Sequence, residues 1–198
     1  MLCRFAARYG TRGTGVDLSR VFLADARARA EELGVADRVG FERAEAAAYA
    51  KSHADGAYDV VSCLGATWIG GGLAGTLDLI RPTLRPGGTV LVGEPYWTQE
   101  PPPEALEAFG AEPDDFADLS GTNERFEAAG FELVEMVLAD QDSWDRYTAP
   151  QWRAISDWLR AHPDDPDAPD MREFLRHART SHLAYGRRYL GWGVFVLR

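Results

Sequence analysis

The sequence predicts an α/β protein built on a doubly wound, mostly parallel β-sheet. Short apolar runs rich in β-branched residues alternate along the chain with stretches whose apolar residues recur at helical spacing. Such alternation is typical of βαβ units, in which a helix crosses between parallel strands. With 198 residues, 45% of them hydrophobic, the chain is long enough to bury a sizeable core. We therefore expect a single domain over residues 1–198.

The first half of the chain contains four predicted strands. Apolar residues recur at helical spacing over residues 2–9 and Gly10 follows, so we expect the end of an amphipathic helix there. Ser19 can cap a later helix whose apolar face is predicted to include Phe22 and Ala30. The elements predicted between Gly10 and residue 100 are strand 14–18, helix 20–33, strand 39–45, helix 46–51, strand 58–64, helix 73–84 and strand 89–93.

The second half adds two strands with a helical insertion between them. Residues 100–120 are acidic and are predicted to be a loop, because three consecutive prolines exclude regular structure there. Asp170 is predicted to cap the second helix of the insertion. A long crossover of this kind joins two neighbouring strands, which makes that pair antiparallel at one edge of the sheet. The elements predicted after residue 120 are helix 123–129, strand 131–138, helical hairpin 140–190 and strand 192–197.

Composition and charge exclude several classes of partner. The formal net charge is −10, so phosphate backbones and anionic lipid would repel the protein, and we expect no nucleic-acid or membrane partner. No apolar run approaches the roughly 20 residues that span a bilayer. Residues 1–9 lack the features of a signal peptide. The two cysteines, Cys3 and Cys63, form no disulfide or metal pattern, so we expect a cytoplasmic protein with no metal site.

The residues that follow each predicted strand are the candidate site, because doubly wound sheets bind ligands beyond the carboxyl ends of their strands. Asp17 follows the first strand, where a carboxylate can accept hydrogen bonds from both hydroxyls of a ribose or can cap the next helix. Glu45 follows the second strand and can accept from an adenine amino group, although an exposed loop glutamate fits equally well. The small residues among 63–66 after the third strand allow a flat ring to approach the backbone.

Aromatic residues mark a second candidate region. After the fourth strand, two aromatics and the carboxylate of Glu94 flank a rigid proline, which is typical of the rim of a substrate cavity or of an anchored surface loop. The hairpin also carries many aromatics, of which some must pack it onto the sheet and others can face a substrate. The candidate substrate-binding residues are Trp68, Tyr96, Trp97, Tyr147 and Trp152.

Taken together, these motifs resemble the class I S-adenosylmethionine-dependent methyltransferase family, which has a Rossmann-like fold. The resemblance covers roughly residues 1–138 and the closing strand, and it implies S-adenosylmethionine as the cofactor. It places Asp17 on the cofactor ribose and Glu45, where the family usually has Asp, near the adenine amino group. The segments that carry the resemblance are 15–19, 41–46, 58–66 and 84–94. The implied cofactor-binding residues are Asp17, Leu18, Ser19, Glu45, Ala46, Cys63, Leu64, Gly65 and Ala66.

The sequence departs from the family at its front end. The family begins with a strand, a Gly-x-Gly-x-Gly loop and a helix, whereas this chain begins inside that helix. The glycine-rich stretch 10–15 precedes a strand, so it is not a nucleotide loop of the strand–turn–helix kind. The missing strand would lie between the strands that contain Val16 and Val60 and would leave two edges without partners. We expect the sequence to start within a longer product; a shortened fold that closes the gap is the alternative.

Other activities have weaker support. A short-chain dehydrogenase needs a tyrosine four residues before a lysine, but Ala47 stands four residues before Lys51, the one lysine of the chain. No Gly-x-Ser-x-Gly elbow is present for a serine hydrolase. A truncated, inactive methyltransferase-like protein that acts as a binding or dimerisation partner is the second hypothesis. Four histidines show no metal-binding pairing and are expected to face solvent: His53, His162, His177 and His182.

We therefore predict methyl transfer from S-adenosylmethionine to a small-molecule acceptor. The acceptor is expected beneath hairpin 140–190, which acts as a cap, and beside the residues after Gly93. Positioning and desolvation can supply most of the rate of an in-line displacement, so a general base is optional. Glu94 is the first candidate for that base because it follows the fourth strand. We also predict a homodimer.

Overall fold

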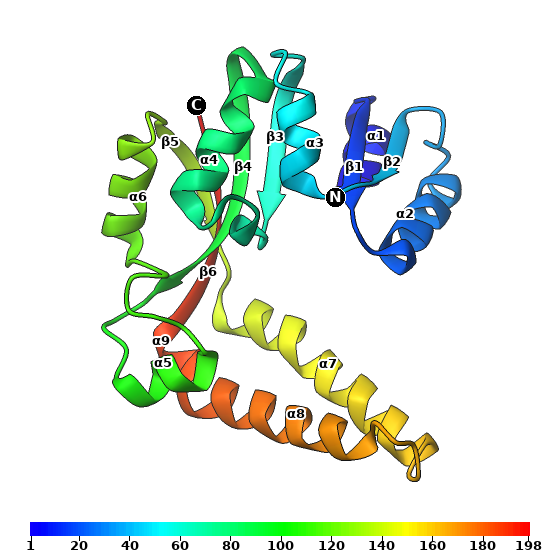
Figure 1. The fold of residues 1–198 in the computed structure, drawn as a ribbon, viewed down its shortest axis with the longest axis vertical. Coiled ribbons are helices and arrows are strands. Elements are labelled where there is room, and N and C mark those ends of the chain that lie inside the picture. The colour runs from blue at the N-terminus through cyan, green and yellow to red at the C-terminus, as the bar shows by residue number, and fades with distance from the viewer.

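The computed structural model describes residues 1–198, and its strands form two separate sheets (Figure 1). β1 (Gly13–Asp17) and β2 (Val39–Arg43) make a parallel pair. The larger sheet has the order β3-β4-β6-β5, in which β3 and β4 are parallel and β6 is antiparallel to both of its neighbours. Its strands are β3 (Tyr58–Leu64), β4 (Leu84–Trp97), β5 (Leu133–Leu138) and β6 (Leu190–Leu197).

Helices connect these strands and give the α/β alternation that the sequence predicts. The predicted hairpin is present between β5 and β6, and it extends away from the larger sheet in Figure 1. None of the helices has both the length and the apolar composition needed to cross a membrane. The helices are α1 (Leu2–Tyr9), α2 (Arg20–Glu32), α3 (Ala46–Ser52), α4 (Leu73–Ile80), α5 (Pro103–Phe109), α6 (Leu119–Ala128), α7 (Gln141–Ala161), α8 (Ala168–Ser181) and α9 (Arg187–Tyr189), with short turns η1 (Thr67–Gly70), η2 (Arg81–Thr83) and η3 (His182–Gly186).

Two hydrophobic cores correspond to the two sheets. The larger core lies where α4 and α6 cover one face of the four-stranded sheet, with Leu77, Phe126 and Phe195 almost fully buried. The smaller core joins α1 and α2 to β2 through residues such as Ala6 and Ala30. Burial of apolar surface at about 25 cal/mol per Å² stabilises each unit. Each sheet is therefore covered by its own helices, with no residue shared between the two cores.

The facing edges of β1 and β3 are not paired with each other. β1 pairs with β2 alone and β3 pairs with β4 alone, as expected from the sequence for the strands that contain Val16 and Val60. A cavity of about 1280 Å³ lies between these edges and runs along both strands. Figure 1 shows the two sheets side by side with the N-terminus between them. The expected gap is therefore present.

Two predictions about the middle of the chain are wrong. The fourth strand does not end at Gly93: β4 continues through Trp97, because residues 94–97 pair with residues 190–193 of β6. Residues 100–120 are not all loop, since α5 starts at Pro103. Proline is tolerated in the first turn of a helix, where its missing N–H has no intrahelical partner to lose.

Smaller corrections concern helix faces and ends. Phe22 is 66% exposed, and Leu23 points inward from α2 instead. Leu84 begins β4 and does not end the preceding helix. The second hairpin helix is preceded by Asp167 at its N-cap, not Asp170, because Pro169 fits within its first turn. The antiparallel pairing of β5 and β6 at one edge of the sheet is as predicted.

Candidate functional site

Asp17 lies at the carboxyl end of β1 and lines the cavity between the sheets. Its Oδ1 accepts a hydrogen bond from the backbone N–H of Ser19 at 2.7 Å. The hydroxyl of Ser19 in turn accepts from the N–H of Phe22 at 3.2 Å and caps α2. Leu18 between them is 60% exposed. One oxygen of Asp17 thus shapes the turn, while Oδ2 accepts no hydrogen bond from the protein.

Glu45 caps a helix at the equivalent end of the neighbouring strand. Its Oε1 accepts from the N–H of Ala47 at 3.0 Å and its Oε2 from the N–H of Ala48 at 2.6 Å. These two backbone hydrogen bonds hold the pKa of the Glu45 carboxyl below its usual value. Because β1 and β2 are parallel neighbours in register, this helix end lies beside the Asp17 turn. Ala46 lines the cavity and Glu45 does not.

The carboxyl end of β3 has the small residues that the sequence indicated. Cys63, Leu64 and Ala66 line the cavity. Gly65 has φ +70, a conformation that favours glycine, and its N–H donates to the carbonyl of Gly93 at 2.9 Å. Burial raises the pKa of the Cys63 thiol, so this buried sulfur stays protonated. Cys63, Leu64 and Ala66 therefore give this wall of the cavity no charged side chain.

Glu94 points away from the cavity. Side chains alternate along a strand, and Glu94 shares its face of β4 with Val92 and Tyr96, which belong to the larger core. Only 3% of Glu94 is exposed, and its Oε2 accepts from the hydroxyl of Thr67 at 2.8 Å. Burial raises the pKa of Glu94 to about 7. The sequence predicts Glu94 at the mouth of a cleft. The structure instead buries its side chain on the core face of β4.

The five predicted substrate-binding residues do not come together. Tyr96 and Trp97 are buried within the fold, 7% and 5% exposed respectively. Trp152 meets the ring of His182 edge-on and packs α7 against the turn that follows α8. Trp68 and Tyr147 are the two that reach the surface, 73% and 65% exposed.

Two of the four histidines are not solvent-facing as expected. His182 is 7% exposed, and its Nε2 lies 2.9 Å from Oδ1 of Asp145. The other oxygen of Asp145, Oδ2, accepts from Arg187. His53 is half-buried beside the cavity and its ring stacks on Tyr49. Burial against aromatic neighbours, which spacing alone does not reveal, explains both errors.

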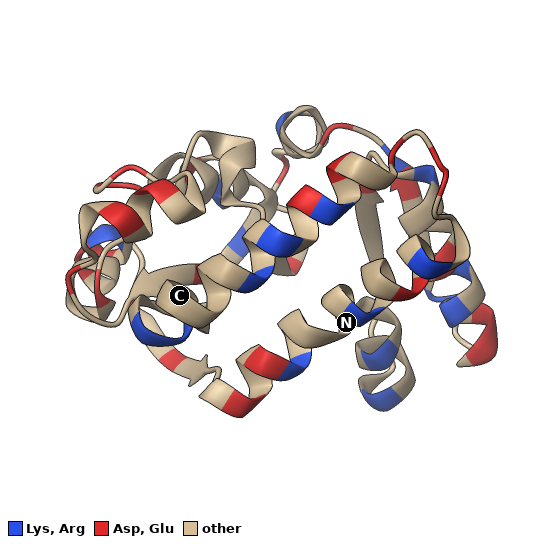
Figure 2. Ribbon diagram, turned by 90° about the horizontal axis from the view of Figure 1, so that it is seen from below, with Lys and Arg blue, Asp and Glu red and all other residues tan.

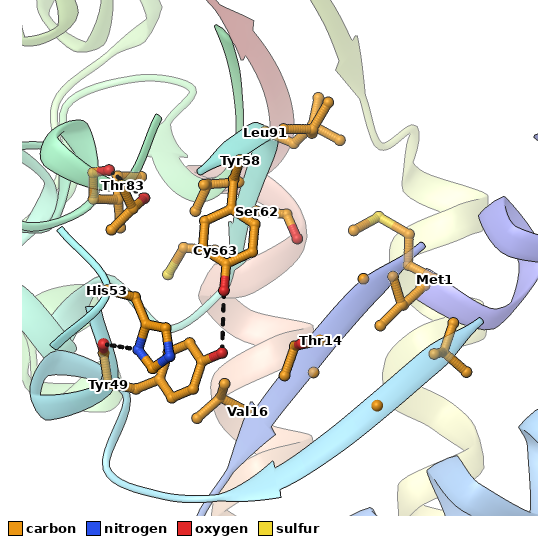
Figure 3. Close-up of a pocket in the computed structure, with 18 of the residues that line it drawn as sticks. Met1, Thr14, Val16, Tyr49, His53, Tyr58, Ser62, Cys63, Thr83 and Leu91 are labelled. Atoms are coloured by element: carbon orange, nitrogen blue, oxygen red, sulfur yellow. Dashed lines mark hydrogen bonds between the residues drawn. The ribbon is translucent and has the colours of Figure 1, made fainter. Parts of the chain in front are cut away.

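A tyrosine pair lines the cavity near the start of β3. The hydroxyls of Tyr49 and Tyr58 are 3.1 Å apart, and this contact raises the pKa of Tyr58 to about 12. Figure 3 shows the Tyr58 ring beside Ser62 and Cys63 of β3, with its hydroxyl directed toward Tyr49, and Thr14 and Val16 of β1 on the other side of Tyr49. Sequence reasoning did not single out these tyrosines. The wall of the cavity therefore combines apolar strand residues with neutral hydroxyls.

Sequence reasoning also missed Trp192 of β6. A Cβ added at Gly65 would lie 2.9 Å from the Trp192 ring, and one added at Gly93 would lie 2.7 Å from it. The ring therefore lies over the ends of β3 and β4, on the face opposite Glu94. Trp144 of α7 stacks near Trp192 with centroids 6.3 Å apart. The available signal was a large aromatic between Gly191 and Gly193 in the last strand.

Comparisons with known proteins identify the family. A family model described as a methyltransferase domain matches residues 1–88. A solved structure of a SAM-dependent methyltransferase from Geobacter sulfurreducens, in complex with S-adenosyl-L-homocysteine, is 48% identical. It superimposes with a TM-score of 0.93, and the match covers 100% of this chain and 79% of that one. This chain belongs to the S-adenosylmethionine-dependent methyltransferases.

Two further relatives match the whole chain, one of them a SAM-dependent methyltransferase and the other uncharacterized. A SAM-dependent methyltransferase from Thiobacillus denitrificans, also solved with S-adenosyl-L-homocysteine, is 44% identical with a TM-score of 0.92. The match covers 100% of this chain and 79% of that one. The uncharacterized protein YjhP of Escherichia coli K12 is 47% identical over 199 residues, which is 100% of this chain and 79% of YjhP. The family and fold class predicted from the sequence are confirmed.

Proposed function

We propose that this methyltransferase binds S-adenosylmethionine at the carboxyl ends of β1 and β3 and methylates a small molecule held there under α7 and α8. The observation that carries the proposal is the half-buried Asp17 carboxylate, with Oδ2 free beside the cavity. A free carboxylate oxygen at the end of the first strand fits the hydroxyls of a ribose. The neutral wall of residues 63–66 across the cavity fits an uncharged purine ring.

The other residues predicted to bind the cofactor at the ends of β1 and β2 shape the turns around it or line its site. Ser19 fixes the turn that orients Asp17, and Leu18 lies exposed beside it. Glu45 fixes the start of α3 with both oxygens from outside the cavity, and the outer lone pair of one oxygen can still accept from an adenine amino group that extends beyond Ala46. Ala46 adds a small surface beside it. This side of the site thus orients the nucleoside part of the cofactor.

When bound, S-adenosylmethionine would supply an electrophilic sulfonium methyl group for an in-line displacement by the acceptor, and Asp17 and residues 63–66 would hold its nucleoside part. The protein's own contribution is to position the reactants and exclude water. Glu94 supports this indirectly, because its bond to Thr67 anchors η1 behind the end of β3. The role of general base that the sequence suggested is not needed in this scheme.

The partner and the cellular location are part of the proposal. The net charge of −10 disfavours nucleic acid and anionic lipid as acceptors, which is compatible with the small-molecule acceptor proposed here. Both cysteines are free and buried, which supports a reducing compartment and hence the cytoplasm. The cap and the domain limits predicted from the sequence, residues 140–190 within one domain over residues 1–198, belong to this proposal as well.

Replacing Asp17 tests the ribose contact. Asp17→Asn keeps an oxygen for the N–H of Ser19 but removes the charge, so the turn is preserved. We expect it to weaken S-adenosylmethionine binding by roughly 1.5–3 kcal/mol in calorimetry, the range for hydrogen bonds to a charged group. Asp25→Asn, on the exposed side of α2, is the matched control. Unchanged affinity in the Asp17 variant, with an intact circular dichroism spectrum, would overturn the assignment.

The second candidate function is an inactive protein that binds a partner through the open edges of β1 and β3. The unpaired edges favour it. The same calorimetry separates the two functions, because only the enzyme needs the cofactor. Absence of S-adenosylmethionine binding by the unmodified chain would favour the inactive partner.

A further inference from the structure

Glu94 is the one acidic side chain of the chain that is buried. Figure 2 shows acidic and basic residues interspersed along the helices, where exposed ion pairs such as Arg29–Glu32 form. Glu94 is instead 3% exposed, on the core face of β4. Burial of an ionisable group is unfavourable unless another group compensates for it. The groups that face Glu94 therefore indicate why a carboxyl is present there.

The hydrogen bond that Glu94 accepts comes from a short turn. Its Oε2 accepts from the hydroxyl of Thr67 at 2.8 Å, and Thr67 begins η1 directly after the wall of residues 63–66. Cys63 of β3 and Arg125 of α6 are the other titratable groups near this carboxyl, and neither bonds to it. Arg125 instead donates to the backbone carbonyls of residues 114 and 115. The turn is therefore the one hydrogen-bond partner of the carboxyl.

Thr67 also joins this turn to α4. Its carbonyl accepts from the hydroxyl of Thr76 at 2.5 Å, and the oxygen of that hydroxyl accepts from the N–H of Gly70 at 3.1 Å. The backbones of turn and helix are in direct contact, since a Cβ added at Gly75 would lie 2.1 Å from the carbonyl oxygen of Gly70. We therefore treat η1 and α4 as one unit, which the side chain of Thr67 ties to β4.

Two residues beside Thr67 line the cavity between the sheets. Ala66 directly precedes η1 and Ile69 lies within it, so both face the cavity beyond the carboxyl end of β3. Glu94 and Thr67 themselves do not line the cavity. The carboxyl can therefore affect a bound ligand only by fixing the positions of Ala66 and Ile69.

We propose that Glu94 is a positioning residue for the cofactor: its hydrogen bond to Thr67 holds η1 so that Ala66 and Ile69 shape the wall of the proposed S-adenosylmethionine site. A buried carboxyl is a well-fixed acceptor, because close packing of the core restricts its rotation. Without this acceptor the cofactor has to order the turn when it binds, and the affinity falls. This inference rests on the proposed function, because it assigns a role within that same site.

A double-mutant cycle on the pair tests the proposal. Calorimetry with S-adenosylmethionine would compare the original chain with Thr67→Val, Glu94→Leu and the double variant. We expect each single variant to bind roughly five- to tenfold more weakly, the effect of one lost hydrogen bond, and the double variant to bind no more weakly than the single variants. Thr67→Ser keeps the donor and Glu94→Gln keeps an acceptor, so both should restore the affinity.

Thr83→Val is the matched control. It removes a buried hydroxyl that donates to the carbonyl of Ile80 at 2.6 Å, at the amino end of β4 and the opposite end of the cavity from the proposed site. We expect this variant to lose stability but not affinity. Circular dichroism of every variant checks the fold before the titration. Should Glu94→Leu fail to fold, the comparison of Thr67→Val with Thr67→Ser still decides.

Several outcomes would overturn the proposal: unchanged affinity in Thr67→Val, additive losses in the double variant, no recovery with serine or glutamine, or equal weakening by Thr83→Val. If the original chain does not bind S-adenosylmethionine, the proposed function fails first. If it binds, and Asp17→Asn weakens binding while the variants of Thr67 and Glu94 do not, only the role of Glu94 is wrong.

Discussion

Among single residues, Glu94 carries the strongest conflict between burial and charge. Its side chain lies in the larger core with Thr67 as its hydrogen-bond donor, and burial raises its pKa from 4.5 to about 7. The folded protein therefore holds a proton that the unfolded chain releases near pH 4.5. Stability from this group is complete below pH 4.5 and is lost as the pH rises toward 7.

Glu94→Gln should remove this pH dependence. The amide oxygen can still accept from Thr67, and no charge is buried at high pH. At pH 8 we expect the variant to be more stable by up to about 3 kcal/mol, and at pH 4.5 to match the original protein. Urea denaturation at both pH values measures the difference. Glu135→Gln, on the exposed side of β5, serves as the control; identical pH profiles for all three proteins would contradict the explanation.

The positions of single candidate residues were predictable where local chain geometry decides them. Asp17 lines the cavity because it follows a strand directly, a position that the sequence shows. Tyr96 was misplaced because it continues a strand whose partner, β6, lies about a hundred residues later in the chain. Trp192 was missed for the same reason: its role depends on Gly65 and Gly93, which are distant in the sequence.

At the scale of elements, β4 and β6 depend on glycine to pack together. Gly191 of β6 lies opposite Tyr96 of β4, and the Tyr96 ring crosses the strand where a Cβ would stand. The core side of this antiparallel pair can therefore hold a large ring only because β6 lacks a side chain there. The pairing extends β4 beyond Gly93, which hydrophobic periodicity did not predict.

Gly191→Ala should destabilise the protein by about 1–3 kcal/mol, the usual cost of overpacking a tight core, because the Tyr96 ring has to move. Gly40→Ala is the matched control: Gly40 also lies in a strand, β2, and the nearest atom to an added Cβ is 3.9 Å away. Urea denaturation of both variants measures the effect. Equal free energies of unfolding would show that Tyr96 adjusts freely.

At the scale of the whole molecule, the separation into two sheets is the dominant feature. The order of strands and helices was predictable from periodicity, glycine and proline, and so was the gap between the strands of Val16 and Val60. The size of the cavity and the packing of α3 beside it depend on tertiary contacts that no local pattern contains. Unpaired backbone groups along β1 and β3 are a ready template for another strand.

We expect the 198-residue chain to self-associate through these edges. Pairing with a second copy would give strand partners to the unpaired N–H and C=O groups of these edges. Val60 on β3 is 50% exposed and lines the cavity. Val60→Lys should weaken association, because a charged edge residue opposes strand pairing. Val21→Lys on α2, where Val21 is 67% exposed away from the cavity, is the control.

Sedimentation velocity over a range of concentrations distinguishes the outcomes. We expect the original chain and the Val21 variant to form dimers or larger species as concentration rises, and the Val60 variant to remain monomeric. A protein that stays monomeric in all three forms, and melts cooperatively, would contradict self-association through the β1 and β3 edges. In that case solvent in the cavity, not a second copy, must hydrogen-bond to those backbone groups.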